Sequence, residues 1–196
     1  ELKHPNNRFV AGTPRVSDGQ LLFLQNLLAK AEDDARIAII LNGSPLFSGD
    51  AGSGESEIRR YVLTNHLLEA IVALPDQMFY NTGIYTYIWI LSKKPNPRRN
   101  HKVQLIDASR CYEARRKSIG TKRNDITDLC RRLIVQAYGE FKNDAVYGDK
   151  DGVYCHSKIF NSEEFGYYKI TVERPQRGEN GEIITKKGKP VADAKL

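Results

Sequence analysis

Cysteines are scarce in this sequence and long hydrophobic runs are missing, and both absences limit what the protein can be. No apolar stretch is long enough to span a bilayer, and the first residues show no signal-peptide pattern. The cysteines Cys111, Cys130 and Cys155 are odd in number and widely spaced, which fits neither a disulfide framework nor a zinc site. We therefore expect a cytoplasmic protein without metal and without membrane contact.

The charge balance is basic, with a net charge of +6 over 196 residues. Positive charge favours a polyanionic partner, because phosphate neutralisation releases counterions from nucleic acid. Two stretches concentrate the charge, Lys93–Lys102 and Arg110–Arg123. Their side chains could position the protein on DNA, or they could stay solvated or face another subunit. The candidate contacts to the DNA backbone are Lys93, Lys94, Arg98 and Arg99.

Alternating helical and strand patterns predict an α/β fold for the first half. Helices are predicted over Gln20–Lys30 and Glu57–Asn65, and strands over Arg36–Leu41, Glu69–Leu74 and Tyr85–Leu91. Ser56 is the expected N-cap of the second helix. The run Arg36–Leu41 is almost wholly apolar, which is typical of a strand buried on both faces of a parallel sheet. The last two strands should pair antiparallel, because the loop between them is too short for a parallel crossover.

The second half carries weaker signals. Val103–Asp107 predicts a strand, and Asp125–Phe141 predicts one amphipathic helix with Leu129 and Leu133 on its inner face. Residues 143–161 show little pattern and are expected to be loop. Tyr168–Glu173 could form a strand, and the tail is expected to be either a β-hairpin or a flexible segment. This divides the chain into a main domain (1–108), a helical and loop extension (109–175) and a basic tail (176–196).

The loop between the last two predicted strands has an unusual composition. It reads Leu74-Pro75-Asp76-Gln77-Met78-Phe79-Tyr80-Asn81-Thr82-Gly83-Ile84. An enzyme that modifies a base takes it out of the stack and then needs a flat apolar partner for it. Phe79 at the rim of a sheet could be that partner, with Tyr80 and Asn81 supporting the pocket. The alternative, favoured by spacing alone, is that Phe79 packs into the core.

The order of segments resembles the adenine-N6 DNA methyltransferases, and more closely the modification (M) subunit of type I restriction-modification systems. The resemblance is carried by Ser17–Gln25, Arg36–Arg60, Glu69–Lys93 and Ile170–Pro175. It implies transfer of a methyl group from S-adenosylmethionine to adenine in double-stranded DNA, together with a specificity and a restriction subunit. It also implies that Phe79 stacks on the flipped adenine.

Two motifs of that family are missing, a Gly-rich cofactor loop after a first strand and the tetrapeptide Asn-Pro-Pro-Phe/Tyr. Ser44-Pro45-Leu46-Phe47 is a poor substitute, because the chemistry needs a side-chain amide and a second proline. The loop Gly49–Ser56 lacks the ending of a P-loop and is expected to be flexible, with a DNA-facing role as the alternative. The absences leave no catalytic residue in this chain, with the cofactor and catalytic motifs upstream of Glu1.

The resemblance therefore implies the C-terminal half of a Rossmann-like class I S-adenosylmethionine-dependent methyltransferase sheet, ending in an antiparallel strand pair. Such a half should be inactive alone, and its exposed sheet edge should favour self-association. The alternative is a non-enzymatic DNA- or protein-binding module, the remnant of a methylase.

Overall fold

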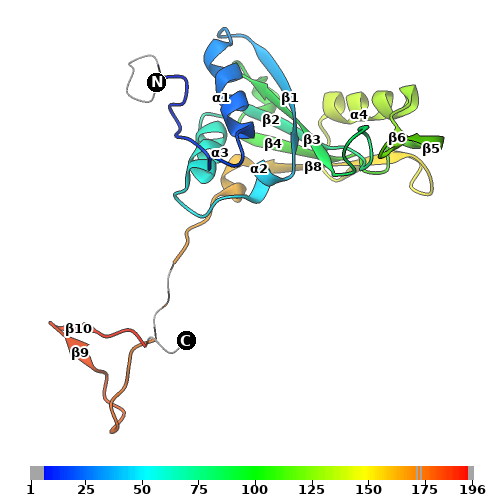
Figure 1. Cartoon of the computed structure of the whole chain (residues 1–196). Helices are drawn as coiled ribbons and strands as arrows, with labels where there is room; N and C mark the ends of the chain where they lie inside the picture. The colour runs from blue at the N-terminus through cyan, green and yellow to red at the C-terminus, as the bar shows by residue number, and fades with distance from the viewer. Residues whose placement is uncertain (1–6, 171, 173, 194–196) are drawn as a thin grey trace. The chain divides into compact units, whose positions relative to one another are not determined.

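A computed structural model describes residues 7–170, 172 and 174–193. The chain forms two compact units, one reaching to Gly166 and the other starting at Tyr167. The first unit holds a six-stranded sheet with helices packed against it (Figure 1). Within the described residues, no helix is long and apolar enough to cross a membrane.

The main sheet has the strand order β1-β3-β2-β4-β8-β7. Its strands are β1 (Arg36–Asn42), β2 (Leu68–Ala73), β3 (Thr86–Ser92), β4 (Lys102–Asp107), β7 (Ala145–Gly148) and β8 (Tyr154–Asn161). β3 lies antiparallel between β1 and β2, and β2 pairs parallel with β4. Consequently β1, β2 and β4 run in one direction, and their carboxyl ends meet at one edge of the sheet. The predicted antiparallel pairing of β2 and β3 is confirmed.

The expectation of a fully buried parallel strand at Arg36–Leu41 is wrong. β1 is an edge strand that pairs antiparallel with β3, and no described residue pairs with its other side. Its residues alternate between exposed and partly buried, and Ile40 is 52% exposed. The apolar composition misled the prediction because the described residues cover only one face of β1.

Helices cover both faces of the sheet, with α1 (Gln20–Lys30) and α3 (Gly54–Thr64) on one face and α4 (Asp128–Glu140) on the other. Successive residues of β3 point to opposite faces and join different cores. Trp89 and Leu91 pack with α1 and α3, whereas Ile88 and Ile90 pack toward the cluster that holds α4. A short helix, α2 (Ser44–Phe47), replaces part of the expected loop after β1.

Two helix starts differ from the prediction. The N-cap of α3 is Ser53, whose side chain accepts a hydrogen bond from the backbone of Ser56, so Ser56 itself lies inside the helix. α4 starts at Asp128 because the Thr127 hydroxyl caps it by accepting from the Cys130 backbone. Its buried residues are Cys130, Leu133 and Ala137, and Leu129 is 47% exposed, contrary to its expected inward position.

The expected loop over residues 143–161 contains β7 and β8, and β8 pairs along β4 inside the main sheet. The sequence hid β8 because its inward positions are the small or polar Cys155 and Ser157. Ser157 accepts a hydrogen bond from the buried Gln104 (2.8 Å), so these two polar side chains are satisfied inside the core.

Residues between β4 and α4 form a hairpin of β5 (Glu113–Ile119) and β6 (Lys122–Asp125). There are also two short 3-10 helices among the described residues. η1 (Pro97–Arg99) precedes β4 in the sequence, and η2 (Ser162–Phe165) follows β8. The second unit contains the hairpin β9 (Thr185–Lys186) and β10 (Lys189–Pro190), as the sequence predicts. No strand forms at the described residues of Tyr168–Glu173, and residues 171 and 173 lie outside the description.

Candidate functional site

The carboxyl edge of the sheet brings the loops after β1 and β2 together. Asn42 at the end of β1 is in register with Thr86, and Ala73 at the end of β2 is in register with Tyr87. A Cβ atom on Gly43 would lie 3.4 Å from the Tyr87 ring, so the chain passes close to the start of β3. Open α/β sheets bind ligands outside the carboxyl ends of their strands, so a binding site is expected at this edge.

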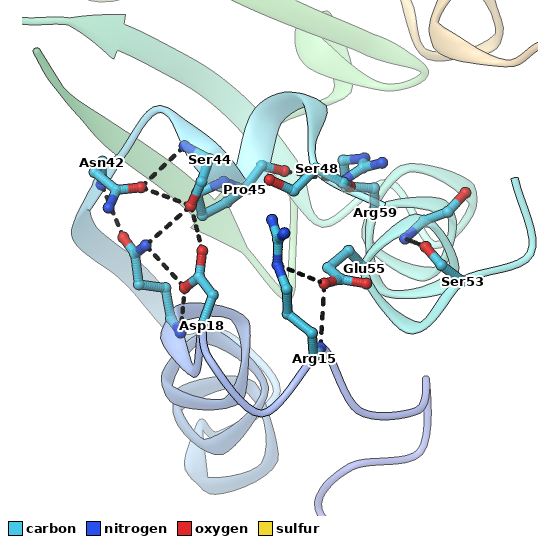
Figure 2. A network of polar contacts seen from close by, with 11 residues as sticks. Arg15, Asp18, Asn42, Ser44, Pro45, Ser48, Ser53, Glu55 and Arg59 are labelled. Carbon is cyan, nitrogen blue, oxygen red and sulfur yellow. Dashed lines mark hydrogen bonds and ion pairs between the residues drawn. The ribbon is translucent and has the colours of Figure 1, made fainter. Parts of the chain in front are cut away.

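A polar network joins the start of α1 to the end of β1 (Figure 2). The Gln20 side chain accepts from the Asn42 backbone (2.8 Å), and the Asn42 amide oxygen accepts from the Ser44 backbone (2.9 Å). The Ser44 hydroxyl donates to Asp18, and this bond lowers the pKa of the Asp18 carboxyl. The Ser44 side chain therefore serves to hold α1 against β1.

A second set of contacts closes the glycine-rich loop after α2 (Figure 2). Glu55 is buried and accepts from the Arg15 backbone (3.1 Å), which keeps the pKa of its carboxyl low. Arg59 donates to the carbonyls of Pro45 (3.1 Å) and Ser48 (2.7 Å). A Cβ atom on Gly49 would meet Ser53 Oγ at 2.3 Å, so the space beside this glycine is filled by protein. The loop does not form an open cradle for a phosphate or a nucleoside.

The Phe79 loop follows β2 at the same edge. The Phe79 side chain is half-buried, Tyr80 is 63% exposed and Asn81 is exposed. Gln77 adopts a positive φ of 52°, and its backbone donates to Gly83 (3.3 Å), which closes the loop on itself. Phe79 is thus neither a core residue nor fully solvated.

The turn and second strand of the β5–β6 hairpin hold this loop through its main chain. Thr121 donates its backbone N–H to the Tyr80 carbonyl (2.9 Å), and its hydroxyl lies 3.1 Å from the Phe79 carbonyl oxygen. Arg123 donates its backbone N–H to the Gln77 carbonyl (2.9 Å). Sequence reasoning missed this contact, since it joins segments about 40 residues apart. The adjacent glycine and threonine in a basic stretch were the only local signal of the turn.

The residues predicted to contact DNA phosphates lie at the other end of the strands from the Phe79 loop. β3 starts beside the Phe79 loop and ends at Ser92, and six steps of about 3.4 Å separate its ends by roughly 20 Å. Lys93 donates to the Ala31 carbonyl (2.8 Å), and Arg98 donates to the Glu140 carbonyl (2.8 Å). Lys94 is exposed. The structure therefore does not bring this basic stretch together with Phe79.

Arg99 is buried and held inside the fold. It donates to Gln104 Oε1 (2.9 Å) and to the Tyr138 carbonyl. Its guanidinium carbon lies 4.0 Å from the ring centroid of Tyr138 and 4.3 Å from that of Phe141. Burial lowers the pKa of Arg99. The side chain joins η1 to β4 and α4, and it is not open to a phosphate.

Metal ligation finds no support in the described part of the chain, where no three His, Cys, Asp or Glu side chains gather. The described residues form an α/β protein that places a half-buried aromatic on a loop fixed by hydrogen bonds at the carboxyl edge of its sheet. The chain belongs to the N-6 DNA methylase family, whose model matches residues 2–181.

Similar proteins include methylase subunits of type I restriction enzymes. The HindI methylase subunit of Haemophilus influenzae is 35% identical over 102 residues, covering 52% of this chain and 22% of that protein. The MjaVIII methylase subunit of Methanocaldococcus jannaschii is 30% identical over 156 residues, covering 80% of this chain and 24% of that protein. The chain thus spans about a quarter of the length of these relatives.

Solved structures of similar proteins have a similar fold. The type I restriction-modification methyltransferase subunit from Streptococcus thermophilus superposes with a TM-score of 0.66 at 26% identity, covering 83% of this chain and 30% of that one. The EcoKI M protein gives a TM-score of 0.55 at 20% identity, covering 75% and 35%, and shows the likeness of fold alone.

Proposed function

We propose that this chain is part of a type I modification subunit that methylates adenine N6 in a specific DNA site with S-adenosylmethionine as methyl donor. The observation that carries the proposal is the Phe79 loop, a braced aromatic loop at the carboxyl edge of the sheet in a member of the N-6 DNA methylase family. In this proposal β1, β3 and β2 are the last strands of a Rossmann-like class I sheet, which is completed by other parts of the subunit.

Phe79 would stack on the adenine after the base leaves the duplex. Its ring is held partly buried by a loop whose main chain is fixed at Gln77, Phe79 and Tyr80, so little freedom remains to be lost on binding. Tyr80 and Asn81 are exposed beside it and can line the same pocket. A base extruded from DNA loses its stacking partners, and a fixed aromatic ring replaces one of them.

The glycine-rich loop of this chain does not fit S-adenosylmethionine. The glycine-rich loop after α2 is closed by Ser53 and Glu55, and a Cβ atom on Gly54 would lie only 1.7 Å from the Thr13 carbonyl oxygen. We therefore assign the cofactor and the catalytic residues to other segments of the subunit, and we expect this chain to be inactive by itself. Double-stranded DNA and the specificity and restriction subunits are the proposed partners, with Lys94 and Arg98 available to DNA or to a subunit.

Phe79→Ala in the full modification subunit should depress methyl transfer to a duplex that carries the recognition site. Loss of one base–aromatic stack is worth about 1–3 kcal/mol, which corresponds to roughly a 5- to 150-fold lower rate. The measurement is incorporation of a labelled methyl group from S-adenosylmethionine, with the melting temperature checked in parallel.

Phe23→Ala is the matched control, because this phenylalanine is also accessible (68% exposed) but lies on α1 and not on the Phe79 loop. It should leave methyl transfer unchanged. If Phe79→Ala also leaves the rate unchanged, the stacking role is refuted and the binding-module alternative gains weight.

We also propose that β1 makes the isolated chain self-associate. Its free edge and the exposed Ile40 offer a template for a second strand. Sedimentation velocity should show a concentration-dependent dimer or larger species, and Ile40→Lys should shift it toward monomer. Val135→Lys, at an exposed apolar residue of α4, should not. A monomer at all concentrations would contradict the proposal.

A further inference from the structure

We propose that the β5–β6 hairpin is the arm that positions the Phe79 loop on DNA, with its turn fixing the loop and its unpaired cations contacting phosphates beside the extruded base. The proposal rests on the proposed function and adds the residues that would grip the DNA. The hairpin cations that have no ion pair with any described residue are Arg116, Lys117 and Arg123. Figure 1 shows the hairpin beside α4, at one end of the first unit.

Several hydrogen bonds connect the hairpin rigidly to the Phe79 loop. The Gln77, Phe79 and Tyr80 carbonyls all accept hydrogen bonds from the hairpin, and Asn124 donates its side-chain amide to the Asp76 carbonyl (3.0 Å). Asn124 is itself buried. A shift of the hairpin must therefore move the backbone that carries the Phe79 ring.

Gly120 makes the close approach possible. It has a φ of +59°, and a Cβ atom there would lie 2.3 Å from the Tyr80 carbonyl oxygen. That atom belongs to the backbone of the loop, so it cannot move aside as a flexible side chain could. Only glycine allows both this backbone conformation and this contact.

The charges of the hairpin fall into two groups. Asp125 pairs with Arg115 and with Lys122 (2.9 Å), and the Lys122 ammonium also lies 5.6 Å from the Tyr80 ring centroid. Arg115 therefore joins the two strands of the hairpin, and Lys122 also lies beside the loop. Arg116, Lys117 and Arg123 are exposed and have no ion pair with any described residue. They leave a surplus of positive charge on the element that carries the loop.

The other basic stretch is a poorer candidate for this role. It starts where β3 ends, at the edge opposite the Phe79 loop, and Lys93, Arg98 and Arg99 each bond a backbone carbonyl of the protein. A base that is extruded toward Phe79 stays attached to its own sugar-phosphate backbone. The phosphates on either side of it must then pass near the loop and the hairpin.

The first test measures DNA binding by this chain with a fluorescent duplex between 50 and 200 mM salt. The triple variant Arg116→Gln, Lys117→Gln, Arg123→Gln should reduce the slope of log K against log salt by about 2–3, since each lost phosphate contact contributes about 0.9. The control triple Lys30→Gln, Lys102→Gln, Lys158→Gln removes the same charge from exposed positions on other elements, α1, β4 and β8. An equal change in both triples, no change in either, or no DNA binding by the wild-type chain would overturn the proposal.

The second test separates positioning from charge. In the full modification subunit at saturating duplex, with 2-aminopurine at the target adenine, Gly120→Ala should lower the fluorescence change on base extrusion and leave the salt slope unaltered. Gly52→Ala is the control, because Gly52 also has a positive φ (+80°) but nothing within 4 Å of its Cβ position. Thr121→Val, which removes the hydroxyl near the Phe79 carbonyl, gives a milder variant if Gly120→Ala fails to fold.

The outcomes also separate this inference from the proposed function. A wild-type fluorescence signal in both Gly120→Ala and Thr121→Val would refute positioning by the hairpin, even where Phe79→Ala still depresses methylation. Loss of the signal in these variants, with Phe79→Ala showing the same loss, would support both. If Phe79→Ala has no effect while the hairpin triple still lowers the salt slope, the stacking role fails and the DNA contact stands.

Discussion

Replacing Arg99 with alanine should lower the free energy of unfolding by about 2–4 kcal/mol, because the change leaves buried acceptors unsatisfied. Gln104 Oε1 and the Tyr138 carbonyl would both lose their donor, and the rings of Tyr138 and Phe141 would lose the guanidinium packed on them. Urea unfolding followed by tryptophan fluorescence measures the effect, since Trp89 is buried in the same unit.

Lys94→Ala in the same basic stretch is the control for Arg99→Ala. Lys94 is exposed, so its loss should change stability by no more than a few tenths of a kcal/mol, within about ±0.5 for surface substitutions. The pair separates a structural arginine from a surface lysine that the sequence alone makes equivalent. Equal stability of Arg99→Ala and the wild type would show that the buried contacts of Arg99 contribute nothing measurable.

Gly54→Ala should destabilise the chain by about 1–3 kcal/mol, which is the usual cost of overpacking a tight contact. Gly54 is the first residue of α3, and its Cβ position is 1.7 Å from the Thr13 carbonyl oxygen. The alanine would push the segment around Thr13 off the helix and would loosen the bond between Arg15 and Glu55. The melting temperature should fall accordingly.

Gly139→Ala should instead stabilise the chain. Gly139 lies in α4, with nothing within 4 Å of its Cβ position, so alanine adds helix propensity without a collision. The gain should be about 0.5–1 kcal/mol, or less because the site is close to the end of the helix. A stabilising Gly54→Ala would contradict the close packing of residues 12–15 on α3.

These predictions assign stability to one end of the strands of the sheet and DNA binding to the other end. Beside η1, the buried Arg99 and Gln104 and the half-buried Tyr138 form a polar cluster that holds α4 to the sheet. At the carboxyl edge, hydrogen bonds from the hairpin fix the Phe79 loop, while Tyr80 of the loop and the basic side chains of the hairpin stay accessible. Substitutions beside η1 should therefore change stability, and substitutions in the hairpin should change DNA binding.

Local patterns were sufficient for several elements. Helical spacing placed α1 at Gln20–Lys30, and the short loop after β2 predicted its antiparallel pairing with β3. The same patterns failed at β1 and β8. An apolar run signals burial but cannot say how many neighbours the strand has, and a strand with Cys155 and Ser157 inward carries no apolar alternation to detect.

The sequence by itself determined the α/β class, the aromatic loop around Phe79 and the resemblance to type I modification subunits, since each depends on residues close together in the chain. Only the tertiary structure decided which basic stretch lies next to that loop. The two stretches have similar composition, but β3 carries Lys93–Lys102 to the far edge while hydrogen bonds from Thr121 and Arg123 fix the other stretch to the Phe79 loop. The charge of a stretch does not say where that stretch lies in the fold. The arrangement of strands in the sheet decides this.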